Sequence, residues 1–350
     1  MTCVTWVCVG TGGVGKTTIA AAIATAIAAT GRTTVVATVD PARRLGHTLG
    51  LPALGTRTAV PGVPNLSALA PDAAADVHAL VERWLADQPV HAAGLAGNPL
   101  LAALGNGFAG IHELVSLVAL ADLNNDAACE ALVIDTAPTR HGLALLALPA
   151  RLSEVIDGRA LAWAGELAKV TPGRGLRSRL TRWGQRRLVS ALTLAAGEVS
   201  ATAAFSLLAF AADLRPELSR LAADAGALLA PAGVRIALVT AARPGALDEV
   251  EQMRAALVAG GHTPALVVIN RAPTGSTRTL ATLPGASAEL RALATRAAEE
   301  LDAARVAADA ITARARDVWR IPTIEIPALS PDDPRAVVTE VARQIAAVVR

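Results

Sequence analysis

A glycine-rich stretch near the beginning of the chain constrains the fold more than any other feature. It reads Gly10-Thr11-Gly12-Gly13-Val14-Gly15-Lys16-Thr17-Thr18 and fits the pattern G-x-x-x-x-G-K-[ST]. An apolar run over residues 4–9 precedes it, and an alanine- and isoleucine-rich run over residues 19–29 follows it. This order predicts a strand, a phosphate-binding loop and a helix, the context in which the pattern marks a site. The alternative, a turn that binds nothing, does not account for the agreement of both flanks.

The chemistry of this loop predicts ATP and Mg²⁺ as ligands. Its four glycines allow the backbone to fold around an anion with the N–H groups pointing inward, and a helix that opens at Lys16 adds its positive N-terminal end. Lys16 is expected to reach the β- and γ-phosphates, and the Thr17 hydroxyl to bind Mg²⁺. The predicted nucleotide-binding residues of the loop are Gly10, Thr11, Gly12, Gly13, Val14, Gly15, Lys16, Thr17 and Thr18.

Composition argues against a nucleic-acid partner. The chain has 350 residues, and 32 Lys and Arg against 30 Asp and Glu leave a net charge of +2, which is too small to recruit a polyanion. Tyr is absent and there are only 3 Phe, so side chains on which bases stack are scarce. We therefore expect no nucleic acid among the partners.

Cysteine usage and hydropathy indicate a cytoplasmic protein without a transmembrane segment. Cys3, Cys8 and Cys129 form no C-x-x-C pair, which predicts a reducing compartment and no disulfide framework. We expect Cys3 and Cys8 to be small buried hydrophobes of the opening strand. Residues 188–212 carry a single charge, Glu198, near the middle of the run. A carboxylate there is costly in a membrane, so we interpret the run as two helices.

Apolar runs alternate along the chain in a way that predicts an α/β fold. Strands are expected over 33–39, 131–134, 234–240, 264–269 and 323–326, and helices over 73–87, 95–123, 143–156, 161–170, 176–229, 246–259, 289–319 and 332–349. Such alternation predicts a mostly parallel sheet with helices on both faces. Residues 52–71, rich in Pro and Gly, are interpreted as irregular surface. The closing helix is expected to pack on the sheet through Val337, Val341, Ile345 and Val348.

The strands divide the chain into two parts. We expect a nucleotide-binding α/β core from residues 1–71, 127–150 and 233–350, with an inserted α-helical subdomain from about 72–126 and 151–232. Ligands of such sheets bind at the carboxyl ends of the strands, where Asp40, Asp135, Thr240 and Asn270 fall. Asp135 is expected to hold Mg²⁺, and Asp40 to orient the attacking water. Alternatively, either carboxylate only caps a helix.

Three segments resemble one family closely. Residues 10–18, 40–45 (DPARRL) and 135–141 (DTAPTRH) resemble the phosphate loop and two switch segments of the ArsA and tail-anchored-protein-targeting ATPases. The resemblance implies an ATPase in which Asp40 is the catalytic carboxylate and Asn270 binds adenine. It also implies that Glu249 senses nucleotide near a dimer interface. Alternatively, Asn270 is a turn residue, and Glu249 a solvated helix residue. A single phosphate loop makes a homodimer the natural expectation.

One departure from the family pattern affects the predicted rate. The family's signature lysine at the start of the loop is replaced by Thr11, and loss of such a cation can cost on the order of 10³–10⁵ in rate. Arg43, Arg44 and Arg140 stand where the family has uncharged residues or His, so one of them is a candidate replacement. The alternative is that all three are surface arginines with no catalytic role.

The sequence leaves the work done by the ATPase open. The family resemblance implies a hydrophobic client helix or a membrane transport partner. Phe205, Leu207, Leu208 and Phe210 either line a client groove or pack a helical core. A three-thiolate arsenite site is not expected, because Cys129 is far from the other cysteines in sequence. Two alternatives are a nucleotide-binding scaffold with little hydrolysis and a ParA- or MinD-like positioning ATPase.

Overall fold

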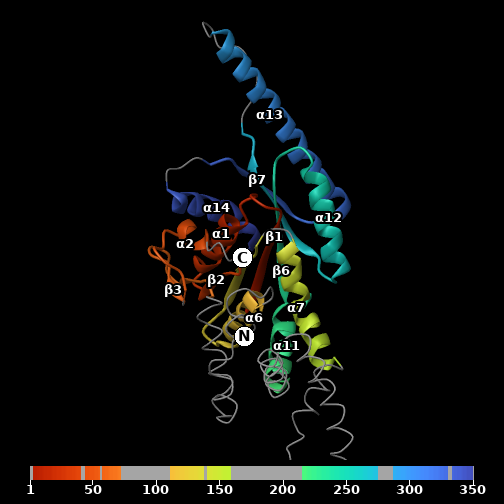
Figure 1. The fold of residues 1–350 in the computed structure, drawn as a ribbon. Coiled ribbons are helices and arrows are strands. Elements are labelled where there is room, and N and C mark those ends of the chain that lie inside the picture. The colour runs from red at the N-terminus through yellow and green to blue at the C-terminus, as the bar shows by residue number, and fades with distance from the viewer. Residues whose placement is uncertain are drawn as a thin grey trace, which may run out of the picture. The chain divides into compact units, whose positions relative to one another are not determined.

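The computed structural model describes residues 3–40, 44–55, 57–71, 111–137, 140–158, 215–274, 287–329 and 333–349 (Figure 1). The chain separates into two compact units. Unit 1 comprises Met1–Ala70, Asp122–Leu146 and Leu228–Arg350, and unit 2 comprises Pro71–Ala121 and Ala147–Ala227. Unit 1 contains the sheet.

An eight-stranded sheet in the order β3-β4-β2-β5-β1-β6-β7-β8 organises unit 1. Its strands are β1 (Val4–Gly10), β2 (Thr34–Thr38), β3 (Thr58–Ala59), β4 (Leu66–Leu69), β5 (Ala131–Asp135), β6 (Val234–Ala241), β7 (Pro264–Ala272) and β8 (Thr323–Pro327). All neighbours pair in parallel except β3 and β4, which are antiparallel. The α/β prediction with a mostly parallel sheet is therefore confirmed.

Helices follow most strands. They are α1 (Lys16–Ala28), α2 (Arg44–Thr48), α6 (Ile111–Asn125), α7 (Arg140–Asp157), α11 (Arg215–Leu228), α12 (Ala246–Ala259), α13 (Ala288–Ala313) and α14 (Pro334–Val349), with a π-helical stretch over Arg314–Trp319. α1 is almost wholly buried because its Ala and Ile side chains are apolar all round. It lies in the main core together with the central strands and α14.

The interpretation of residues 52–71 as irregular surface is wrong. This region contains the short strands β3 and β4, and β4 pairs in parallel with β2 over Thr34–Ala37. Leu66 and Ala68 alternate into the core, which is the pattern of a half-buried strand. A four-residue strand between Pro, Gly and Asn residues is too short for its periodicity to stand out.

The closing helix has a different buried face from the predicted one. Val341 and Ile345 are buried as expected, but Val337 is only half-buried and Val348 is 36% exposed. The buried face instead consists of Val338, Val341, Ala342, Ile345 and Val349. These side chains join the main core, where α14 lies beside α1 (Figure 1) and also contacts β8. The helical spacing of the apolar residues was predicted correctly, but the side of the helix that faces the core was predicted only in part.

Parts of the predicted helical subdomain lie outside the described residues. These are residues 72–110 and 159–214, which include the candidate groove residues and the low-charge run, so the subdomain stays a prediction. Within unit 2, Leu152 and Ile156 of α7 pack with Leu218 and Ala222 of α11. None of the helices in the described part of the chain is long and apolar enough to cross a membrane.

Candidate nucleotide-binding site

The glycine-rich loop connects β1 to α1 with a backbone that only glycine fits at two positions. A Cβ atom on Gly10 would lie 2.1 Å from the Val239 carbonyl oxygen of β6, so β1 and β6 approach too closely for any side chain there. Gly15, the N-cap of α1, has φ 91° and ψ 26°. This left-handed conformation is strained for other residues. The glycines at these two positions therefore fix the backbone conformation of the loop without a ligand.

The Lys16 side chain folds back onto the beginning of the glycine-rich loop. Its Nζ donates a hydrogen bond of 2.9 Å to the Thr11 carbonyl oxygen, and the residue is only 6% exposed. Burial lowers the pKa of Lys16, while the Asp135 and Asp40 carboxylates oppose that shift. The structure thus brings Lys16, Asp40 and Asp135 into one electrostatic neighbourhood, as the strand ends in the sequence predicted.

Asp135 is the most perturbed acid of the site. It ends β5 and lies opposite Cys8 of β1 and Thr38 of β2, which places it in the centre of the sheet edge. The residue is 1% exposed. Burial raises the pKa of Asp135 to about 7, although hydrogen bonds with Thr17 and Thr38 act in the opposite direction. Its Oδ1 is buried and has no hydrogen-bond partner among the described residues.

Thr38 connects Asp135 to the end of β2. Its hydroxyl donates a 3.1 Å hydrogen bond to Asp135 Oδ2 and accepts one of 3.1 Å from the backbone N–H of Asp40. Asp40 is half-buried and is the last described residue before position 44. The two carboxylates predicted to act on the nucleotide are therefore linked through one side chain that the sequence analysis did not single out.

The donor set suits Mg²⁺. Mg²⁺ is a hard ion that takes oxygen ligands and is usually held by one or two carboxylates together with substrate phosphates. A buried carboxylate oxygen without a partner, on Asp135, and the nearby Thr17 hydroxyl supply such oxygens. No cluster of three or more His, Cys, Asp or Glu side chains occurs within the described ranges, and a site completed by phosphate needs none.

A side-chain hydrogen bond fixes the segment after β5 to β1. Thr136 is buried and its hydroxyl donates a 2.7 Å hydrogen bond to the Cys8 carbonyl oxygen. A Cβ atom on Gly142 of α7 would lie 2.8 Å from that same hydroxyl oxygen. The small residue lets the first turn of α7 approach the strand end, which the sequence pattern alone did not reveal.

Asn270 contacts the loop itself. Its Nδ2 donates a 2.9 Å hydrogen bond to the Val14 carbonyl oxygen, and its Oδ1 accepts one from the Arg271 N–H. A Cβ atom on Gly15 would lie 2.3 Å from Asn270 Nδ2. The contact places β7 against the loop, and the adenine contact implied by the family resemblance stays a prediction.

Glu249 has a cationic partner that sequence reasoning missed. Both of its carboxylate oxygens accept hydrogen bonds of 2.7 Å from Arg243 Nη2. Arg243 follows β6, and Glu249 lies in the first turn of α12. A spacing of six residues across a loop has no recognisable pattern, so only the fold reveals the pair. The nucleotide-sensing role of Glu249 stays a prediction.

Thr11 and one candidate arginine are placed by the structure. Thr11 Oγ1 is buried and has no hydrogen-bond partner in the part of the chain that the structure describes. Arg44 begins α2 and is exposed, and its charge helps to lower the pKa of Lys16, so it lies near the loop. Arg43 and the Arg140 side chain lie outside the described residues.

Comparisons with known proteins point to one family. The model of the family described as anion-transporting ATPase (ArsA) matches residues 4–171. An ATPase ASNA1 homologue of Paramecium tetraurelia is 33% identical over 149 residues, which are 41% of this chain and 44% of the relative. An ATPase get3 of Aspergillus terreus is 31% identical over 152 residues, 43% of this chain and 45% of the relative.

A third relative carries a different name. It is called an arsenical pump-driving ATPase, comes from Prosthecochloris vibrioformis, and is 34% identical over 149 residues, 41% of this chain and 35% of the relative. The matched region thus spans less than half the length of each of these relatives. It includes the glycine-rich loop, Asp40 and Asp135, but neither Glu249 nor Asn270. Over residues 4–171 this chain is thus similar to the ArsA/GET3 family of ATPases.

Proposed function

We propose that this protein binds ATP with Mg²⁺ in the glycine-rich loop and hydrolyses it as an ArsA-type ATPase. The observation that carries the proposal is the buried, unpartnered Oδ1 of Asp135 beside the hydroxyl of Thr17 and the ammonium of Lys16. A buried carboxylate that retains a free oxygen is costly, and a bound cation removes that cost. The relatives are all named as ATPases, which supports the same activity.

Each residue of the site has a separate task in this proposal. The N–H groups of the loop and the N-terminus of α1 hold the phosphates, and Lys16 exchanges the Thr11 carbonyl for phosphate oxygens. Thr17 and Asp135 hold Mg²⁺, which neutralises charge that develops on the phosphates. Asp40 orients the attacking water. Asn270 keeps the loop closed through Val14 and contacts adenine.

Thr11 sets the expected rate. A neutral hydroxyl supplies no charge to the transferred phosphate, so we expect turnover slower than that of a family member with lysine there, by up to roughly 10³–10⁵. Arg44 is the candidate that partly replaces this cation, because its charge acts on Lys16. The alternative function is a scaffold that binds nucleotide with little hydrolysis.

Coupling to a partner completes the proposal. We infer a homodimer, because the chain has a single glycine-rich loop. We also infer that a hydrophobic client helix or a membrane transport partner binds differently to the ATP-bound and ADP-bound forms. One relative is named for driving an arsenical pump, which supports the second reading. A cytoplasmic location follows from these partners. A ParA- or MinD-like positioning role is the remaining alternative.

Isothermal calorimetry with Mg²⁺ and ATP tests binding. We expect wild-type protein to bind and Lys16→Ala to bind at least roughly 100-fold more weakly, because two or more charge-assisted hydrogen bonds are lost. Arg343→Ala, which removes an exposed cation of α14, is the matched control and should bind as wild type. Equal affinity of Lys16→Ala and wild type contradicts the proposal.

A turnover assay separates the ATPase from the scaffold. Thr11→Lys should release phosphate faster than wild type, and Arg44→Ala more slowly, each with affinity for ATP measured in parallel. Phosphate release at the background rate in both wild type and Thr11→Lys, with intact binding, favours the scaffold. Adding liposomes, arsenite or a tail-anchored peptide then shows which partner, if any, stimulates turnover.

A further inference from the structure

Two cysteines that are distant in sequence meet at the amino end of the central strands. Cys3 Sγ and Cys129 Sγ lie 3.7 Å apart. Cys129 is 4% exposed, and Cys3 is half-buried. The third cysteine, Cys8, is fully buried within β1. The separation of 126 positions between the first two had suggested no relation between them.

The register of the sheet brings the two thiols together. Cys3 immediately precedes β1, and one residue, Glu130, separates Cys129 from β5. The two strands pair in parallel with Val4 opposite Ala131. The Val4 N–H donates to the Glu130 carbonyl oxygen at 3.0 Å. The strand starts are thus held side by side by backbone hydrogen bonds, so the proximity of the thiols does not depend on flexible side chains alone.

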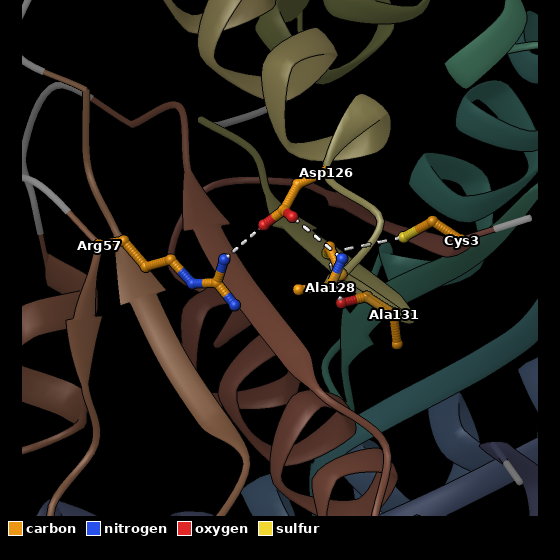
Figure 2. Close-up of polar contacts among 6 residues, drawn as sticks. Cys3, Arg57, Asp126, Ala128 and Ala131 are labelled. Atoms are coloured by element: carbon orange, nitrogen blue, oxygen red, sulfur yellow. Dashed lines mark hydrogen bonds and ion pairs between the residues drawn. The ribbon is translucent and has the colours of Figure 1, made fainter.

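A hydrogen-bonded turn fixes Cys129. The Asp126 carbonyl oxygen accepts from the Cys129 N–H at 2.9 Å, and Asp126 Oδ1 accepts from the Ala128 N–H at 2.9 Å. Arg57 Nη1 donates to Asp126 Oδ2 at 2.8 Å (Figure 2). An arginine from the segment before β3 therefore lies beside the turn that carries the thiol.

The two thiols have different acidities. The hydrogen bond from Cys3 lowers the pKa of Cys129, and the Arg57 charge lowers it further, against burial and the Asp126 carboxylate. The same hydrogen bond, together with burial, raises the pKa of Cys3. These directions favour Cys129 as the attacking thiol and Cys3 as the resolving thiol.

We propose that Cys3 and Cys129 form an oxidisable dithiol site. A hydroperoxide oxidises the two thiols reversibly to an intramolecular disulfide. Only two sulfurs meet here, and no group of three or more metal-ligating side chains occurs within the described ranges, which favours oxidation over metal binding. The two Sγ atoms are 3.7 Å apart and must approach to about 2.05 Å to form a disulfide bond.

The reaction balances with hydrogen peroxide as oxidant. The Cys129 thiolate attacks one peroxide oxygen, the O–O bond breaks, and hydroxide leaves to become water with a solvent proton. The Cys3 sulfur then attacks the Cys129 sulfur, the S–O bond of the sulfenic acid breaks, and its oxygen leaves as water with the Cys3 proton. The two thiols lose two electrons, and one peroxide becomes two waters.

Peptide mapping of the wild-type protein tests the proposal directly. After peroxide and alkylation, we expect a mass loss of two hydrogens and one linked pair of peptides that contain Cys3 and Cys129, reversed by dithiothreitol. The bond closes a long loop, so the oxidised protein should melt on the order of 5 °C higher than the reduced protein. Free thiols at both positions, or only sulfinic acid at Cys129, contradict the proposal.

Three variants sharpen the test. Cys8→Ala keeps both thiols of the site and should form the bond as wild type, whereas Cys3→Ser should stop at the sulfenic acid of Cys129, which dimedone traps. Arg57→Gln should shift the pH midpoint of the peroxide reaction upward, because the thiolate loses a nearby cation while Cys3 and Asp126 remain. A midpoint that Arg57→Gln leaves unchanged contradicts the assigned role of Arg57.

Discussion

The two ends of β5 show opposite ways of burying an acid. At its carboxyl end, Asp135 is buried without enough compensation, and its pKa is raised to about 7. At its amino end, the turn before β5 carries Cys129, whose pKa is lowered by the Cys3 thiol and the Arg57 guanidinium despite burial. The surroundings thus lower the pKa of the thiol before β5 and raise the pKa of the carboxyl group that ends the strand.

The difference shows where each end obtains its positive charge. The amino end has its own cation, since Arg57 approaches from the segment before β3. At the carboxyl end, Asp135 Oδ1 has no hydrogen-bond partner among the described residues, and under the proposed function a cation that arrives with the nucleotide would bind there. At the carboxyl end the Lys16 ammonium bonds to the Thr11 carbonyl oxygen and leaves Asp135 Oδ1 without a described partner, which suits ligand binding. At the amino end Arg57 is already paired with Asp126 beside the thiols.

The largest expected effect is on turnover at the carboxyl end. Asp135→Asn should lower the rate of phosphate release at least about 100-fold, because a neutral amide holds Mg²⁺ poorly and several kcal/mol of charge stabilisation are lost. Asp126→Asn at the other end is the matched control. Comparable losses in both variants would abolish the distinction between the two ends.

The pH dependence of stability should follow the raised pKa of Asp135. Without Mg²⁺ or nucleotide, the folded chain holds this proton more tightly than the unfolded chain. The stabilisation is therefore complete below about pH 4 and is lost as pH rises through 7. Urea denaturation at pH 5 and 8 should show a decline on the order of 2–4 kcal/mol that Asp135→Asn removes. An equal decline in the variant would assign it to other groups.

A glycine pair separates the ligand site from ordinary backbone strain. Gly15 and Gly31 have φ of 91° and 92°, but only at Gly15 would a Cβ meet another group, Asn270 Nδ2. Gly15→Ala should weaken ATP binding roughly tenfold by calorimetry, because the left-handed conformation and the contact must both be relieved. Gly31→Ala should cost stability alone. Weaker binding in both would indicate a general effect of strain.

The contact between β7 and the loop should have a smaller effect. Asn270→Ala removes the hydrogen bond to the Val14 carbonyl oxygen and should weaken ATP binding about fivefold. Binding of GTP alongside ATP tells the two roles of Asn270 apart. A loss shared by both nucleotides reflects the loop contact, and a loss confined to ATP reflects adenine recognition.

The smallest expected effect joins the two ends. Cys3→Ser should change ATP affinity by less than about twofold, because the six residues 4–9 separate Cys3 from the loop by roughly 20 Å. The same should hold for the peroxide-treated wild type. A change above about fivefold in either would show that the two ends are coupled through β1 and β5.

The sequence predicted most of the sheet, and it placed the glycine loop, Asp40 and Asp135 at strand ends, because both depend on local patterns; the roles of these residues in nucleotide binding stay predictions. Strand ends, the glycine loop and the acids that follow apolar runs are all readable along the chain. Strand β4 was missed because four residues carry too little periodicity. The Arg243–Glu249 pair, the Asn270 contact with Val14 and the meeting of Cys3 with Cys129 were not predictable, because each depends on the register between segments far apart in the chain.

The Thr38 hydroxyl makes two hydrogen bonds at once in this fold. It donates to the Asp135 carboxylate and accepts from the backbone N–H of Asp40. The ends of β2 and β5 are therefore joined through a single side chain, so a change of charge on the Asp135 carboxylate acts on the oxygen that also accepts from the Asp40 N–H. We expect Thr38→Val, which keeps the shape of the side chain, to remove both hydrogen bonds and separate the two strand ends.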